Sequence, residues 1–190
     1  MRGEWCYFHK HFSDQTCDDI IKMGLKIPPE PGKIGLDGVL VESNIRKSQV
    51  RFINKPHNDF NFLFDEIWKL ASQGNDEWFN FHLSRLNFLQ FTEYNGGSND
   101  EYQRHHDVFW LNNDPMYHRK LTCVIQLTDP STYDGGNFEI YDLQDSPVPD
   151  AIRQRGTVLF IPSFTYHAVT PVTQGTRHSI VAWIEGPKWR

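Results

Sequence analysis

The chain has 190 residues, of which 38% are hydrophobic, 14% aromatic and 23% charged. This length and composition exclude a disordered chain, a coiled coil and a collagen-like repeat, and they suit one domain with a core that needs no disulfide or structural metal. The 19 basic and 24 acidic residues leave a net charge of −5, which argues against a protein that binds nucleic acid.

The first third of the chain predicts a helix, a loop and a short strand. Ser13 is a favourable N-cap for a helix over residues 14–25, in which Cys17 and Ile20 recur at helical spacing. Residues 27–38 contain three prolines and three glycines and are expected to form a loop. Within a wider segment, 28–45, this loop is a candidate lid or a plain connector. A short strand is expected over residues 48–53.

A second helix is expected to begin with Asn58 or Asp59 as its N-cap. The apolar residues that follow form one stripe at helical spacing, which ends at Gly74-Asn75. This stripe is interpreted as core packing, because amphipathic helices in globular proteins turn such a face inward.

From residue 79 onward the hydrophobic period becomes alternating. The expected strands cover residues 88–94, 121–127, 137–141, 157–161, 167–170 and 177–184. Glycine-containing turns separate them. Helices followed by six or more short strands favour a mainly β fold, a sandwich or jelly roll braced by N-terminal helices. We expect one domain over residues 1–190, with helical support over about 1–75 and a jelly-roll core over about 79–190.

Two further features bear on location. No apolar run approaches the length of about 20 residues that a membrane span needs, and Met1–Lys10 lacks the apolar core of a secretory signal. The three cysteines, Cys6, Cys17 and Cys123, share no metal-type spacing and are expected to be buried thiols. These features predict a cytoplasmic protein with no membrane partner.

The sequence contains two copies of a His-x-Asp pattern. In the copy at 105–107, His105 and Asp107 would point to the same face of a strand, where both can reach one metal ion. The copy at 57–59 lies at a predicted helix start, where its polar side chains already serve as caps. The pattern alone is weak, because about one copy is expected by chance in a chain of this composition.

His167 is the candidate third ligand, from a distant strand. Two histidines and one carboxylate are typical of non-haem Fe(II) centres that activate oxygen, whereas structural zinc prefers four ligands, usually with cysteine. Arg177 follows ten residues later, and a hairpin across residues 171–176 would return it beside His167. A buried arginine needs a partner, and its planar fork suits a carboxylate.

As a set, these residues resemble the prolyl 4-hydroxylase branch of the 2-oxoglutarate- and Fe(II)-dependent dioxygenases, most closely its short, stand-alone microbial or phage members. The stretches with the resemblance are Tyr102-x-x-His105-x-Asp107, Leu121-Thr122, Asp134-Gly135-Gly136, and His167 to Arg177 together with Trp183. The resemblance implies a double-stranded β-helix, which is a cupin-like jelly roll, with Fe(II) bound by His105, Asp107 and His167.

The same resemblance assigns the cosubstrate pocket. Arg177 matches the residue that pairs with the distal carboxylate of 2-oxoglutarate, and Tyr94, Thr122 and Trp183 match positions that line the pocket. Tyr102 is the alternative to Tyr94, because the stretch between Tyr94 and the metal ligands is about two residues longer than in collagen-type relatives. The implied reaction consumes O2 and 2-oxoglutarate, releases succinate and CO2, and uses ascorbate to keep the iron reduced.

The substrate implied by the resemblance is proline in a peptide or protein. Phe109, Trp110 and the segment 28–45 would then form the mouth and lid of the site, or else core and connector. A free amino acid or small metabolite remains an alternative, and so does a non-catalytic jelly-roll binding module. Nucleic-acid demethylase relatives have a second arginine six residues after the cosubstrate arginine, where this chain has Trp183.

Overall fold

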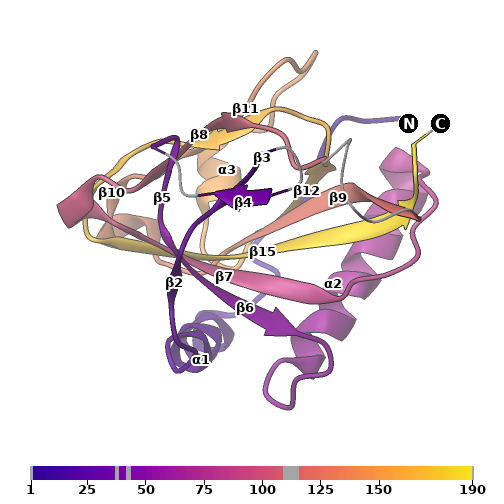
Figure 1. Cartoon of the computed structure of the whole chain (residues 1–190). Coiled ribbons are helices and arrows are strands. Elements are labelled where there is room, and N and C mark those ends of the chain that lie inside the picture. The colour runs from indigo at the N-terminus through magenta and orange to yellow at the C-terminus, as the bar shows by residue number, and fades with distance from the viewer. Residues whose placement is uncertain (1, 37–38, 42–43, 109–115, 190) are drawn as a thin grey trace.

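The computed structural model describes residues 2–36, 39–41, 44–108 and 116–189. Two antiparallel sheets face one another, and the two longest helices lie outside the larger sheet (Figure 1). The larger sheet has the order β1 (Cys6–Phe8), β12 (Val158–Pro162), β9 (Tyr117–Gln126), β15 (Thr176–Pro187), β7 (Phe88–Asn95), β6 (Gln49–Asn54), β2 (Glu30–Pro31). The smaller sheet has the order β11 (Phe138–Ile140), β13 (His167–Val169), β8 (Glu101–His105), β5 (Arg46–Lys47).

The remaining elements are helices and two short strand pairs. The helices are α1 (Asp14–Gly24), α2 (Asn61–Gly74) and α3 (Pro149–Arg153). The strand pairs are β10 (Asp134–Gly135) with β14 (Val172–Gln174), and β3 (Ile34–Leu36) with β4 (Val39–Val41). This arrangement is the expected mainly β jelly roll, in which the N-terminal segment also supplies edge strands of the larger sheet.

Strand alternation divides the larger sheet into an apolar face and a polar face. On β7, Leu89 and Phe91 pack with α1 and α2 in the main core, whereas Gln90 and Tyr94 face the space between the sheets. On β15, Ile180 and its even-numbered neighbours join the same core. Because side chains alternate along a strand, the odd-numbered positions of β15 face the smaller sheet.

Helix α2 anchors this core, and its two phenylalanines on opposite faces provide a test. Phe64 is 0% exposed and Phe62 is 45% exposed. We expect Phe64→Ala to lower the free energy of unfolding by about 3–5 kcal/mol, because it removes a fully packed ring. The matched variant Phe62→Ala is expected to change it by no more than about 0.5 kcal/mol. Urea denaturation of both variants measures the difference, and equal losses would contradict this packing.

The expected helix boundaries are partly right. Ser13 caps α1 as predicted, since its Oγ accepts a hydrogen bond from the Thr16 backbone N–H. The prediction that Asn58 or Asp59 caps α2 is wrong, because the helix begins at Asn61 after a turn. The Asn61 side chain instead accepts a hydrogen bond from the His57 backbone N–H at 3.0 Å. Past Gly74, α2 continues into a π-helical turn over Asn75–Phe79, which lengthens the predicted helix.

The segment expected to be a loop contains short strands. Residues 30–31 pair with β6 at the open edge of the larger sheet, and β3 and β4 form a hairpin. Proline is tolerated there because an edge strand needs no donor on its outer side. Residues 37–38 and 42–43 of the candidate lid lie outside the described residues. No helix among the described residues is long and apolar enough to cross a bilayer.

The predicted strands are found with shifted ends. The largest shift of an end is in β9, which begins four residues before the predicted run. The three cysteines are free and buried, as expected. Burial raises the pKa of the Cys6 thiol to about 12, so this side chain behaves as an apolar group.

Candidate metal centre

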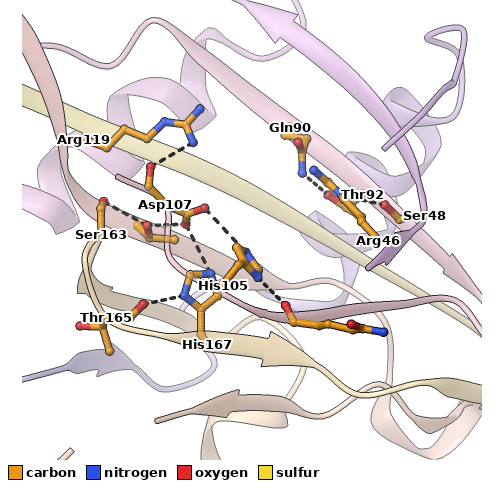
Figure 2. Close-up of polar contacts among 12 residues, drawn as sticks. Arg46, Ser48, Gln90, Thr92, His105, Asp107, Arg119, Ser163, Thr165 and His167 are labelled. Atoms are coloured by element: carbon orange, nitrogen blue, oxygen red, sulfur yellow. Dashed lines mark hydrogen bonds and ion pairs between the residues drawn. The ribbon is translucent and has the colours of Figure 1, made fainter. Parts of the chain in front are cut away.

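His105, Asp107 and His167 meet between the two sheets. His105 ends β8 and His167 begins β13, and the two residues are directly opposite in the pairing of these neighbouring strands. One ligand atom from each of the three side chains lies within 4.8 Å of the others. Figure 2 shows the two imidazoles and the carboxylate directed toward one another. The strand pairing therefore explains how residues so far apart in the sequence can share one ion.

Asp107 reaches this point from outside the strand. The expectation that it shares a strand with His105 is wrong, because β8 ends at His105. The Asp107 backbone N–H instead donates a hydrogen bond to the Ser163 carbonyl at 2.8 Å, which ties this turn to the chain after β12. The carboxylate is thus positioned by a contact between segments and not by strand alternation.

Backbone carbonyls orient both imidazoles. His105 Nδ1 lies 2.8 Å from the Gln103 carbonyl, and His167 Nδ1 lies 2.9 Å from the Thr165 carbonyl. A carbonyl can only accept a hydrogen bond, so each Nδ1 is the donor. In its neutral form each ring then presents the lone pair of Nε2, and this is the form that binds a metal. These Nε2 atoms lie 3.8 Å and 3.4 Å from the Asp107 carboxylate oxygens.

The pKa shifts of His105 and Asp107 suit metal binding. Burial, followed by the charge of His167, lowers the pKa of His105 to about 3, so its imidazole is neutral near neutral pH. Burial alone would raise the pKa of Asp107. The charge of His167 and its hydrogen bond outweigh burial and hold that pKa below its usual range. The carboxyl group is therefore ionised. Burial lowers the pKa of His167, but the charge of Asp107 and its hydrogen bond outweigh burial and raise it, so this ring releases its Nε2 proton when an ion binds.

Thr122 holds the Asp107 carboxylate from the larger sheet. Its Oγ1 donates a hydrogen bond to Asp107 Oδ2 at 2.7 Å, and Ser163 Oγ lies 3.1 Å from the same hydroxyl. Thr122 is fully buried on β9. The sequence placed Thr122 in the cosubstrate pocket, and the structure adds this contact with the candidate ligand.

The Thr122 contact yields a quantitative prediction. Thr122→Val preserves the shape of the side chain and removes the hydroxyl, so the carboxylate loses the donor that orients it. We expect the affinity for Fe(II), or for Mn(II) as a redox-stable substitute, to fall about 10–100-fold. Titration calorimetry measures this change. Thr173→Val, at an exposed position on β14, is the matched control, and an equal effect in both variants would contradict the assigned contact.

The predicted metal-binding and cosubstrate-binding residues line one cavity between the sheets. Its volume is about 190 Å³. Since one water needs roughly 10–15 Å³ on this scale, there is room for about a dozen water-sized groups, which suits a small dicarboxylate. The predicted residues on its wall are Tyr94, His105, Asp107, Thr122, His167, Arg177 and Trp183.

Arg177 extends into this cavity from β15. The prediction that a hairpin brings it beside His167 is wrong, because β13 and β15 belong to different sheets and the chain crosses between them. Arg177 is 1% exposed, and its Nη2 donates a hydrogen bond to Gln126 Oε1 at 2.8 Å. Its Nε and Nη1 have no hydrogen-bond partner among the described residues. A buried guanidinium with two unused donors is suited to bind a carboxylate.

The turn at Asp134-Gly135-Gly136 packs against this arginine. Gly136 has a φ of +60°, and a Cβ there would lie 2.9 Å from Arg177 Cδ. Glycine is therefore required both for the backbone conformation and for the close approach of the turn. This contact explains why glycine occurs at position 136, in the Asp134-Gly135-Gly136 stretch that contributes to the family resemblance.

The aromatic residues predicted for the site have different contacts in the structure. Tyr94 is buried, with its ring centroid 5.5 Å from the Arg177 guanidinium, whereas Tyr102 stacks on His105 with ring centroids 3.5 Å apart. Trp183 Nε1 is buried with no hydrogen-bond partner among the described residues. Phe109 and Trp110 lie outside the described residues. The second His-x-Asp copy, at the start of α2, is not part of a metal-type cluster in the described chain.

Sequence reasoning missed several polar residues of the site. Arg46 and Arg119 line the cavity, and Gln126 binds Arg177. The alternation along β9 could have indicated Gln126, which follows Thr122 by four residues. Arg119 could not be found this way. The pairing of β9 with β15 shifts at Lys120, and this bulge turns Arg119 toward the cavity.

The donor set fits iron. Two imidazole nitrogens and one carboxylate on one side of an ion leave other coordination positions open, as in non-haem Fe(II) oxygenases. No cysteine and no fourth protein ligand joins the cluster in the described chain, so a closed structural zinc site does not fit. The unused donors of Arg177 then suit the carboxylate of a cosubstrate in the same cavity.

Comparisons with known proteins agree with this chemistry. Residues 89–185, just over half of the chain, match the family model described as "2OG-Fe(II) oxygenase superfamily". A PKHD-type hydroxylase of Pseudoalteromonas atlantica is 32% identical over 102 residues. That match covers 50% of this chain and 42% of the relative, so the likeness extends over less than half of that protein's length.

Solved structures support the jelly-roll fold over nearly the whole chain. A Pseudomonas putida prolyl-4-hydroxylase has a TM-score of 0.71 at 17% identity, and the match covers 97% of this chain and 93% of that one. A prolyl hydroxylase from Trichoplax adhaerens, in complex with a hypoxia inducible factor peptide fragment, has a TM-score of 0.71 at 16% identity. That match covers 96% of this chain and 83% of the other. At these identities the likeness establishes the fold.

Proposed function

This chain belongs to the 2OG-Fe(II) oxygenase superfamily, and we propose that His105, Asp107 and His167 bind its iron. Fe(II), 2-oxoglutarate and O2 follow from the family. The observation behind the residue assignment is the convergence of these three side chains in the cavity that also contains Arg177, whose Nε and Nη1 have no hydrogen-bond partner among the described residues. An inert barrel would not need this set of polar groups in its interior.

We assign the distal carboxylate of 2-oxoglutarate to Arg177. Its Nη2 is held by Gln126, so the guanidinium is oriented before a ligand arrives, which lowers the entropic cost of binding. Tyr94 and Trp183 line the same cavity and restrict the space available to the cosubstrate. Thr122 keeps the Asp107 carboxylate in place.

When bound, iron and 2-oxoglutarate supply the oxidising chemistry, in which O2 provides one oxygen atom to succinate and one to the hydroxylated substrate, with release of CO2. The protein residues position these reactants and limit access of water. The Nδ1–H donors of His105 and His167 remain on the backbone carbonyls, so both Nε2 atoms stay available to the ion.

We propose an aliphatic C–H of a peptidyl proline as the target. The support is the resemblance to prolyl 4-hydroxylases, together with the peptide that is bound to the Trichoplax adhaerens prolyl hydroxylase of similar fold. Ascorbate is the proposed reductant. Host and self peptides incubated with the enzyme, Fe(II), 2-oxoglutarate and ascorbate should gain one oxygen atom on proline, as detected by mass spectrometry.

The test of the enzyme class needs no primary substrate. Fe(II), 2-oxoglutarate and O2 are expected to give slow, uncoupled succinate formation, measured by mass spectrometry with and without ascorbate. A non-catalytic binding module would give none. Absence of succinate in a folded protein that binds Fe(II) and 2-oxoglutarate would contradict the proposed function.

A further inference from the structure

The cavity has an unusual excess of positive charge. Among the described residues, four basic side chains line it, Lys33, Arg46, Arg119 and Arg177, against a single carboxylate, that of Asp107. The whole chain has a net charge of −5, so this excess is local. Bound Fe(II) and 2-oxoglutarate have opposite charges that cancel one another. The excess therefore remains in the proposed enzyme, and like charges in a buried site cost free energy unless an anion joins them.

Two of these cations already have a counter-charge. Arg177 is assigned to 2-oxoglutarate. Arg119 donates a hydrogen bond to the Asp107 carbonyl at 3.4 Å and interacts with the negative charges of Asp107 and Glu185. Its guanidinium also lies 3.8 Å from the centroid of the Trp183 ring. These contacts explain why Arg119 can be half-buried in the absence of a further anion.

Arg46 has no such counter-charge. It is 9% exposed, and its two hydrogen bonds go to neutral groups, the Ser48 hydroxyl and the Lys33 carbonyl, both at 3.1 Å. No carboxylate in the described chain lies within ion-pair distance of its guanidinium. A buried arginine normally has an anionic partner. The expected partner of Arg46 is therefore outside the described protein atoms.

Arg46 is adjacent to the candidate metal ligands. Its guanidinium lies 4.6 Å from the centroid of the Tyr102 ring, and the same ring stacks on His105 at 14°. Figure 2 shows Arg46 on one side of His105 and Arg119 on the other. An anion bound by Arg46 would therefore lie close to the candidate metal ligands, on the side of the cavity lined by Lys33 and Arg46.

We infer, on the basis of the proposed function, that the primary substrate has a carboxylate close to the hydroxylated carbon, and that Arg46, assisted by Lys33, binds it. The planar guanidinium can hold a carboxylate through two parallel hydrogen bonds. The carboxylate belongs either to an Asp or Glu side chain beside the target residue of a peptide, or to a free small acid. Both sources require the same cation in the same place.

Binding in the absence of O2 tests this inference without turnover. The enzyme is loaded with Fe(II) and 2-oxoglutarate and equilibrated with acetylated, amidated pentapeptides that have a central proline flanked by Asp or Glu, or by Asn or Gln. L-Proline and L-prolinamide form a second arm. Mass spectrometry of the probes that stay bound to the enzyme measures the ratio of each acid to its amide. In at least one arm, the acid should exceed its amide by at least about tenfold.

Three variants separate charge from structure. Arg46→Gln is expected to abolish the excess, and Arg46→Lys, which retains the charge, to restore part of it. Lys47→Gln is the matched control, because Lys47 is the next residue on β5, is exposed and lies outside the cavity. It should retain the full excess. Loss of the excess in Lys47→Gln as well would contradict the assignment to Arg46.

The remaining outcomes are also decisive. Retention of L-proline but not of acidic peptides supports a free acid as the source, and the converse supports an acidic peptide. Equal retention of acids and amides, or retention of neither, overturns the inference. Uncoupled succinate formation, measured on the same preparation, distinguishes failure of this inference from failure of the proposed function. If succinate forms but acids are not preferred over amides, only this inference fails. If no succinate forms, the proposed function fails.

Discussion

Replacement of His167 by alanine is expected to abolish uncoupled succinate formation. The variant would leave only His105 and Asp107 as protein ligands, too few to hold the ion in a fixed geometry. Loss of an outer contact to a metal ligand costs about 10–100-fold, so loss of a ligand itself should cost more than that. The rate is measured by mass spectrometry of succinate at saturating 2-oxoglutarate over a series of Fe(II) concentrations.

His57→Ala is the matched control for this variant. His57 begins the second His-x-Asp copy, and its Nδ1 is buried with no hydrogen-bond partner among the described residues. The substitution should leave succinate formation at the wild-type rate. Circular dichroism of both variants excludes unfolding as the cause. Wild-type activity in His167→Ala, or loss of activity in His57→Ala, would show that the ligands have been assigned to the wrong residues.

Alternation along the strands made much of this site predictable. Tyr94 and Arg177 are directly opposite one another in the pairing of β7 and β15, so both side chains face the cavity. The apolar residues at the alternate positions of each strand, such as Phe91 on β7 and Ile180 on β15, face the helices. A period of two residues in the sequence is enough to assign these faces, because every second side chain of a regular strand points the same way.

Irregular backbone explains what the sequence could not predict. Asp107 is positioned by a hydrogen bond to Ser163, and Arg119 by a bulge at Lys120. Neither feature has a local sequence signal, since both depend on which segments lie side by side. Arg46 was missed for a related reason. It lies on a two-residue strand that pairs with β8, and such a short element has no detectable period.

Replacement of Arg177 by methionine is expected to raise the KM for 2-oxoglutarate by about thirtyfold or more. Removing one partner of a buried, hydrogen-bonded charge pair costs about 2–5 kcal/mol, and each 1.36 kcal/mol is a factor of ten. The Fe(II) requirement should change little, because Arg177 is not among the candidate ligands. Initial rates of succinate formation at varied 2-oxoglutarate and at varied Fe(II) measure the two effects separately.

Arg177→Lys and Arg155→Met are the informative comparisons. Lysine keeps the charge but lacks the planar fork, so its KM should lie between those of wild type and the methionine variant. Arg155 is paired with Asp18 outside the cavity, and its replacement should leave the KM unchanged. An equal rise in KM for Arg155→Met would indicate a general charge effect.

The stability of the Arg177→Met variant distinguishes a binding role from a structural one. Without cosubstrate, the wild-type guanidinium is buried with two donor nitrogens unused and no carboxylate partner among the described residues, which is an unfavourable state. A methionine of similar length avoids that cost. We therefore expect the variant to be at least as stable as wild type without 2-oxoglutarate and to gain little when it is added. Thermal denaturation with and without the cosubstrate measures both. A large loss of stability in the ligand-free variant would contradict the view that this arginine is kept for its ligand.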